Sequence, residues 1–208
     1  MKKYKKYLIF ILITMGSQAL IYFLIKLFIN DYNIINSFLD VPLIRPFIFI
    51  YDSWYPFIIL ITFIIYKHNK NLFYILISTM LFSAFISQIT FIAYPSMITR
   101  PTIEVHNLTD WLLDFTYKAD TPAVNCLPSM HCIYCFITGF YILKCKEVSS
   151  KIRFSIITYS FLIVLSTLFT KQHIIEDVLL AIIYTIISIT VIYLNKERII
   201  KIFNKLKI

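Results

Sequence analysis

The sequence predicts an all-α integral membrane protein, a bundle of about six transmembrane helices with both termini in the cytoplasm. Of the 208 residues, 59% are hydrophobic and only 15% are charged. A soluble domain of this length needs more polar residues than that to cover its core. The hydrophobic residues also lie in long blocks bounded by charged ones, as in a chain that crosses a bilayer several times. We therefore expect a single membrane domain over residues 1–208.

The expected spans follow one another along the chain. Each is interpreted as a helix, because an open sheet cannot satisfy its backbone inside lipid. The first has a basic start, but its apolar run is too long for a typical signal peptide, so we expect it to be retained. The fourth is short for a bilayer of about 30 Å, so it is expected to begin before residue 130 and to end near Lys144. The expected spans are residues 8–29, 47–66, 72–94, 130–143, 154–170 and 174–194.

The distribution of Lys and Arg predicts the orientation. Most of the 20 basic residues lie at the two termini, between the second and third spans, and between the fourth and fifth. By the positive-inside rule these segments are cytoplasmic, so we expect a multi-pass protein of the cell membrane. Cys126 is then expected to be reachable from outside and Cys145 from inside. The basic tail, residues 195–208, is expected to lie against anionic lipid, with nucleic-acid binding as a remote alternative.

The long outer connection between the third and fourth spans holds a short amphipathic segment. Leu108, Trp111, Leu112 and Phe115 recur there at helical spacing. This pattern predicts either a helix lying in the membrane interface or a loop helix packed on the bundle.

The cysteines give no sign of a metal site. Cys132 and Cys135 have a two-residue spacing, but they lie inside an apolar run with no second pair to complete a set of ligands. We expect them to pack in the core.

Three separated segments with chemically active side chains are expected to meet at the outer surface. Arg100 follows the third span, Ser129 and His131 open the fourth, and His173 and Asp177 open the sixth. The fourth and sixth spans both run inward, so their positive N-terminal ends face outward. Such ends favour an anion such as phosphate.

These residue types fit phosphate chemistry. His173 and Asp177 are four residues apart and share one helix face, so the carboxylate can fix the tautomer of the ring and leave its other nitrogen free to attack. His131 can donate a proton to a leaving oxygen, and the Arg100 fork matches phosphate oxygens. Ser129 adds a hydroxyl and a backbone N–H. Each residue alone also has an ordinary explanation: a satisfied polar histidine, a helix cap for Asp177, or a snorkelling anchor for Arg100.

At these positions the sequence resembles the type 2 phosphatidic acid phosphatase (lipid phosphate phosphatase) superfamily. That family has the pattern Lys-x6-Arg-Pro, Pro-Ser-x-His and Ser-Arg-x5-His-x3-Asp. The corresponding residues here are Ala93-x6-Arg100-Pro101, Pro128-Ser129-Met130-His131 and Ser166-Thr167-x5-His173-x3-Asp177.

The resemblance covers residues 72–194, which would form the phosphatase-like core after two N-terminal spans in residues 1–71. It implies a metal-free and cofactor-free mechanism through a phosphohistidine. His173 would be the nucleophile, Asp177 its partner and His131 the general acid. Arg100, Ser129 and Ser166 would hold the phosphoryl oxygens, although a serine in the fifth span can instead bond its own helix backbone.

Two positions depart from the family pattern. Ala93 replaces the lysine of the first motif, and Thr167 replaces the arginine of the third. The loss of two cations weakens the charge stabilisation on which phosphoryl transfer depends. Lys171, two residues before His173, is a candidate to supply one of them.

Three further segments resemble the subgroup related to inositol phosphorylceramide synthases. In that subgroup Asp52, Asp120 and Asn125 would shape the substrate site, and ordinary polar packing is the alternative for each. The segments are residues 51–56, residues 166–173 and Asp120-x4-Asn125-x2-Pro128-Ser129.

Three functions are compatible with these residues. The first is a phosphatase that hydrolyses a lipid-linked phosphate or pyrophosphate at the outer face. The second is a phosphotransferase that passes a phospho-head group to an alcohol. The third is a membrane protein that has lost activity, as the two missing cations would permit. The expected partners are the bilayer and a lipid phosphate, and no nucleic acid.

Overall fold

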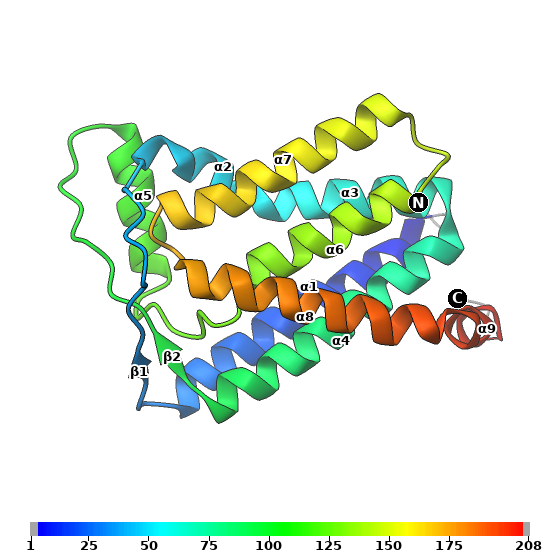
Figure 1. Cartoon of the computed structure of the whole chain (residues 1–208), viewed down its shortest axis with the longest axis horizontal. Coiled ribbons are helices and arrows are strands. Elements are labelled where there is room, and N and C mark those ends of the chain that lie inside the picture. The colour runs from blue at the N-terminus through cyan, green and yellow to red at the C-terminus, as the bar shows by residue number, and fades with distance from the viewer. Residues whose placement is uncertain (1–3, 206–208) are drawn as a thin grey trace.

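The computed structural model describes residues 4–205 and is an all-α membrane bundle (Figure 1). Five segments are long and apolar enough to cross a membrane, and they match the first, second, third, fifth and sixth predicted spans. They are Lys5–Phe28 (α1), Arg45–His68 (η2, α2 and α3), Lys70–Ala93 (α4), Ser150–Phe169 (α7) and Ile175–Leu194 (α8).

The fourth predicted span is the short helix α6, Met130–Lys144. It ends where expected, but the expectation that it begins before residue 130 is wrong. Ser129 caps the helix, since its side chain accepts a hydrogen bond from the Cys132 N–H at 3.4 Å. Its 15 residues would measure roughly 22 Å along the axis. α6 packs against α3, α4, α7 and α8, so it lies at the centre of the bundle.

The second span is interrupted rather than continuous. It comprises the 3₁₀ turn η2 (Arg45–Phe47), α2 (Ile48–Asp52) and α3 (Trp54–His68). Pro56 has no N–H to donate to the carbonyl of Asp52, so the regular helical bond is missing at the break. The Ser53 hydroxyl instead donates to the Ile50 carbonyl at 2.6 Å. The break leaves Tyr51 and Asp52 beside the candidate site.

Loops, two short strands and one amphipathic helix gather at the end of the bundle opposite the termini (Figure 1). Strands β1 (Asn33–Ile34) and β2 (Ser96–Met97) pair in parallel, with Asn33 opposite Ser96. Helix α5 is Leu108–Ala119, as the periodicity predicts. It buries Leu113 against the bundle, whereas Trp111 and Phe115 stack on each other and are more than half exposed.

The C-terminal tail forms helix α9, Lys196–Lys205, which the sequence analysis did not predict as a helix. The Phe203 ring stacks on Tyr74 of α4, with centroids 4.6 Å apart and planes 3° from parallel. Both termini lie at the same end of the bundle (Figure 1). This arrangement agrees with an even number of crossings, and the face of the membrane to which each end belongs stays a prediction.

Candidate functional site

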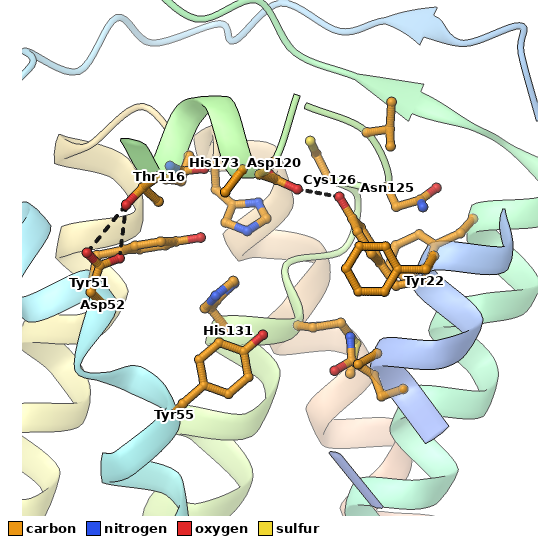
Figure 2. A pocket seen from close by; sticks show the side chains of 18 of the residues that line it. Tyr22, Tyr51, Asp52, Tyr55, Thr116, Asp120, Asn125, Cys126, His131 and His173 are labelled. Atoms are coloured by element: carbon orange, nitrogen blue, oxygen red, sulfur yellow. Dashed lines mark hydrogen bonds between the residues drawn. The ribbon is translucent and has the colours of Figure 1, made fainter. Parts of the chain in front are cut away.

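Three of the predicted active residues, Arg100, His131 and His173, line one cavity of about 310 Å³ at the end of the bundle that carries α5 (Figure 2). Its walls come from α1, the α2–α3 break, α5, the segment 120–126, the start of α6 and the turn before α8. The lining residues are Gln18, Ala19, Tyr22, Phe23, Tyr51, Asp52, Tyr55, Phe91, Arg100, Thr116, Ala119, Asp120, Val124, Asn125, Cys126, Met130, His131, Gln172 and His173.

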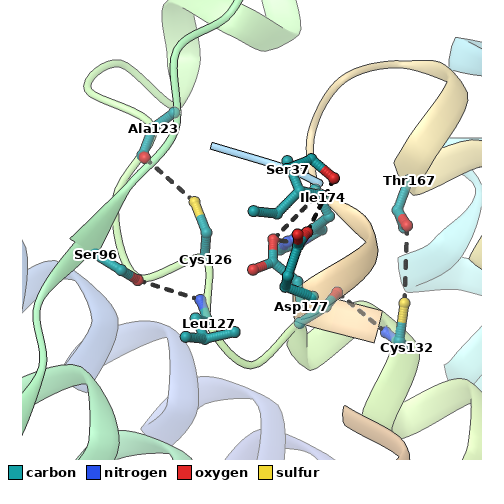
Figure 3. A network of polar contacts seen from close by, with 12 residues as sticks. Ser37, Ser96, Ala123, Cys126, Leu127, Cys132, Thr167, Ile174 and Asp177 are labelled. Carbon is teal, nitrogen blue, oxygen red and sulfur yellow. Dashed lines mark hydrogen bonds and ion pairs between the residues drawn. The ribbon is translucent and has the colours of Figure 1, made fainter. Parts of the chain in front are cut away.

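His173 lies at the junction of α7 and α8, held by Asp177. Its Nδ1 lies 2.9 Å from Asp177 Oδ2, and the same oxygen accepts the Ile174 N–H at 3.1 Å (Figure 3). The carboxylate therefore caps the start of α8 and orients the ring at once. A carboxylate that accepts from Nδ1 favours the tautomer in which Nε2 carries the lone pair. Since Asp177 is fully buried, water does not compete for this bond.

His131 opens α6 and faces His173. The centroids of the two imidazole rings are 5.6 Å apart. Two aromatic rings hold His131, Tyr51 at 4.8 Å and Trp54 at 4.4 Å between centroids. The Trp54 indole N–H donates to the His131 carbonyl at 3.2 Å, which fixes the Trp54 ring against the backbone of α6. The α2–α3 break thus positions the second histidine.

Arg100 lines the cavity, and its guanidinium already contacts Asp120 and the Tyr117 ring. Its Nη2 lies 2.6 Å from Asp120 Oδ2, and its guanidinium lies over the Tyr117 ring, 5.1 Å from the centroid. Tyr22 donates a hydrogen bond to the other oxygen of Asp120 (Figure 2). Burial raises the pKa of Tyr117 to about 12, so the phenol stays protonated and donates to the Thr170 carbonyl at 2.7 Å. Among the described residues the buried Nε of Arg100 has no hydrogen-bond partner, so a phosphate competes with the Asp120 carboxylate only for Nη2.

Asp52 lies on the other side of the histidines from Asp120 (Figure 2). Both of its oxygens accept weakly from the Thr116 hydroxyl of α5, at 3.4 Å each. Within residues 4–205, no three His, Cys, Asp or Glu side chains are grouped so that they could hold a metal ion.

Two amides line the cavity with no hydrogen-bond partner for either side-chain atom among the described residues. They are Asn125, which is 5% exposed, and Gln172, which is 1% exposed. Asn125 was among the predicted substrate-shaping residues. Gln172 was missed, although it directly precedes His173, because no periodicity or motif shows that its side chain enters the cavity.

Lys171 does not supply the missing cation. Its ammonium lies 2.7 Å from Asp40, and the residue does not line the cavity. α7 ends in a Schellman-type turn, in which the Lys171 N–H donates to the Leu168 carbonyl and the Gln172 N–H to the Thr167 carbonyl. Lys171 takes the left-handed position of this turn, with φ 54°, so Lys171 meets Asp40 while Gln172 meets the cavity.

The hydroxyls of Ser129 and Ser166 both form hydrogen bonds with helix backbone groups. The Ser166 hydroxyl donates to the Ile163 carbonyl at 2.7 Å, and Ser166 does not line the cavity. This corrects its expected role as a phosphate ligand. Ser129 caps α6, and its own N–H donates to the Asp177 carbonyl at 3.3 Å. Thr167, at the position of the third-motif arginine, bonds the Val164 carbonyl, so it also stays within its helix.

The four cysteines are buried and free, so the core-packing interpretation of Cys132 and Cys135 is confirmed. Cys126 donates to the Ala123 carbonyl at 3.2 Å (Figure 3), and burial raises the pKa of its thiol. Cys126 and Cys145 are 3% and 0% exposed, so the expectation that reagents reach them is wrong for the folded protein.

The fold and the cavity define an integral membrane protein with two histidines, an orienting aspartate and an arginine at one end of its bundle. Residues 18–191 match the family model of the PAP2 superfamily, so the chain belongs to that superfamily. Its members are generally phosphatases or phosphotransferases, which places this chain among such enzymes. No curated protein and no solved structure matches the chain.

Proposed function

We propose that the protein is a phosphatase that hydrolyses a lipid-linked phosphate or pyrophosphate through a phosphohistidine, with its active site at the outer face of the membrane. The observation that carries this proposal is the His173–Asp177 hydrogen bond of 2.9 Å beside His131, in a cavity that also holds Arg100. A nucleophile, its orienting base and a proton donor are then within reach of one phosphorus atom.

The reaction has two steps. In the first, the His173 Nε2 lone pair forms a bond to phosphorus, the bond from phosphorus to the leaving oxygen breaks, and His131 protonates that oxygen. In the second, His131 takes a proton from a water molecule, the water oxygen bonds to phosphorus, and the phosphorus–nitrogen bond breaks. Asp177 stabilises the positive charge that the His173 ring carries between the steps.

The shape of the cavity supports a lipid-linked substrate. α1 is joined to α3 near the termini, where the Tyr7 hydroxyl donates to the Ile59 carbonyl at 2.7 Å. At the other end, the cavity lies between these two segments, and its lining includes Phe23 and Tyr55, which are 62% and 55% exposed. A head group at the histidines can therefore be joined to a chain that leaves between α1 and α3 into the apolar region.

A phosphotransferase is the second candidate, because polar groups lie on both sides of the histidines. Asp120 lies on one side, and Asp52 with Thr116 on the other (Figure 2). Asp120 is the partner of Arg100. An alcohol bound at either side can replace water in the second step. The first step is the same in both reactions.

The deciding experiment measures phosphate release in EDTA from a panel of lipid phosphates and pyrophosphates. We expect metal-independent release by the wild-type protein and none by His173→Ala. His106→Ala is the matched control, since His106 is exposed on the loop before α5 and does not line the cavity. Equal release by wild type and His173→Ala would refute the mechanism. Loss of the phospho group from the donor lipid only when an alcohol is present, with the phosphorylated alcohol as product and no free phosphate, would establish the transferase.

A further inference from the structure

The charges that line the cavity do not suit a doubly charged anion. Among the described lining residues, Arg100 is the only permanent cation, whereas Asp52 and Asp120 are carboxylates. Arg100 is itself paired with Asp120 at 2.6 Å. Ala93 is exposed at the end of α4 and Thr167 is bonded within α7, so the two positions where the family has cations contribute none.

Two amides without hydrogen-bond partners among the described residues line the same cavity as the histidines. A buried amide without a hydrogen-bond partner is unfavourable, and native proteins rarely leave one unless a ligand satisfies it. Asn125 and Gln172 have neither polar side-chain atom satisfied within residues 4–205, and both are more than nine-tenths buried. Both face the same cavity as His131 and His173.

The backbone holds both amides in place before any ligand arrives. The Asn125 N–H donates to the Ser96 carbonyl of β2 at 2.8 Å, and Asn125 has φ 56°, a left-handed conformation that asparagine tolerates better than most residues. The Gln172 N–H donates to the Thr167 carbonyl at 3.0 Å in the turn that ends α7. These bonds fix the backbone from which each amide side chain extends into the cavity.

We propose that Asn125 and Gln172 bind phosphoryl oxygens, and that these neutral ligands make the site selective for a phosphate group with one negative charge, a phosphodiester, over a doubly charged monoester. This inference rests on the phosphohistidine chemistry proposed above. Of the two candidate functions, it favours the phosphotransferase, whose donor lipid is a phosphodiester, over hydrolysis of a monoester. The amide N–H groups donate to a singly and a doubly charged group alike. The second charge of a monoester has no further cation to compensate its loss of water, and it faces Asp52 and Asp120.

Cleavage of a diester at this site balances without a further reagent. His173 Nε2 bonds to phosphorus, one ester oxygen leaves with the proton from His131, and the second ester group stays on the phosphohistidine. Water or an alcohol then releases that group. The phosphorus carries a single negative charge in the substrate and, when an alcohol is the acceptor, in the product as well.

Trp54 provides a direct readout of binding, since its ring lies 4.4 Å from that of His131. The chain has two tryptophans, so a Trp111→Phe background leaves Trp54 as the only one. The full-length protein in nanodiscs is titrated with dimethyl phosphate, which has one negative charge, and with methyl phosphate. Methyl phosphate is doubly charged at pH 8 and singly charged well below its second pKa of about 6.

At pH 8 we expect dimethyl phosphate to bind at least about tenfold more tightly than methyl phosphate, with the difference shrinking as the pH falls to 5. Gln172→Lys and Asn125→Lys add a cation and should each move the preference toward methyl phosphate by about tenfold, a change of about 1.4 kcal/mol. Gln172→Leu should weaken both probes alike. Gln88→Leu is the matched control, since Gln88 lies on α4 and does not line the cavity, and it should change neither affinity.

Tighter binding of methyl phosphate at pH 8, equal affinities in wild type and Gln172→Leu, or binding of neither probe would each overturn the inference. Phosphate turnover is measured separately on the same samples. A protein that binds the probes with the expected preference but turns over no ester refutes the proposed function and leaves the assignment of the two amides standing.

Discussion

Replacement of Asp177 by asparagine tests how the His173 ring is held. The carboxylate accepts from Nδ1 at 2.9 Å and is fully buried. A hydrogen bond to a charged group contributes about 1.5–3 kcal/mol. In Asp177→Asn this bond is lost, and the new amide can donate to Nδ1, which favours the tautomer whose Nε2 carries the proton and cannot attack. Together these changes shift the balance by about 3–6 kcal/mol, so we expect the rate of phosphohistidine formation to fall roughly 10²- to 10⁴-fold.

The assay is single-turnover phosphohistidine formation with a radiolabelled substrate, quenched in alkali. The same oxygen accepts the Ile174 N–H, so an amide nitrogen in its place also removes this cap, and the thermal unfolding midpoint should fall slightly while the protein still folds. Glu176→Gln is the matched control. It makes the same change in the same helical turn, but Glu176 accepts from Ser37 and the Phe38 N–H away from the cavity. A rate for Asp177→Asn within threefold of wild type, with the fold intact, would refute this account of the His173 ring.

Three further predictions concern topology, pH and packing. Glu104 and Lys146 are both exposed, so Glu104→Cys should react with an impermeant maleimide from outside and Lys146→Cys from the cytoplasmic face, while the wild type stays unlabelled. Labelling of both variants from one face would reject the topology. The hydrogen bond from Arg45 lowers the pKa of Asp110, so the bond stabilises the fold at neutral pH. Asp110→Asn should lower the unfolding midpoint by a constant amount down to about pH 4, the unfolded pKa, and by less below it. A difference in midpoint between wild type and variant that grows in acid would contradict this. Phe203→Ala should cost about 1–2 kcal/mol of unfolding free energy through lost aromatic packing; an unchanged unfolding curve would show that α9 contributes no stability.

The spans were predictable because each carries its own signal. Five apolar blocks were located to within a few residues by hydropathy alone. The short α6 was located too, but it was expected to begin before residue 130. It begins at Met130, because Ser129 caps it. The break at Ser53 needed one more step, which was to follow the missing N–H of Pro56 to the unpaired carbonyl of Asp52.

Side-chain direction at the ends of helices was not predictable in the same way. His173 and Asp177 lie within one helical repeat, so their contact followed from spacing. Lys171 and Gln172 lie in a turn, where the left-handed φ of Lys171 decides which of the two reaches the cavity. No periodicity reports such a φ, and a lysine at a position that usually holds glycine gives no warning. From the sequence, Lys171 was predicted to lie in the site and Gln172 was not. In the structure Gln172 lines the cavity and Lys171 does not.

The wall that α1 contributes holds none of the groups proposed to carry out the chemistry, and it reaches toward them through a hydrogen bond from Tyr22 to Asp120, the partner of Arg100. Gln18, Ala19, Tyr22 and Phe23 all lie on α1, whereas the histidines, Asp177 and Arg100 come from α4 onward. α1 packs mainly along α4 and is largely exposed elsewhere. Substitutions on its cavity face can therefore alter which molecules fit while the nucleophile and its partner keep their geometry. A protein built in this way can change what it accepts by evolving its first helix alone, and chimaeras that exchange only that helix would transfer the preference with it.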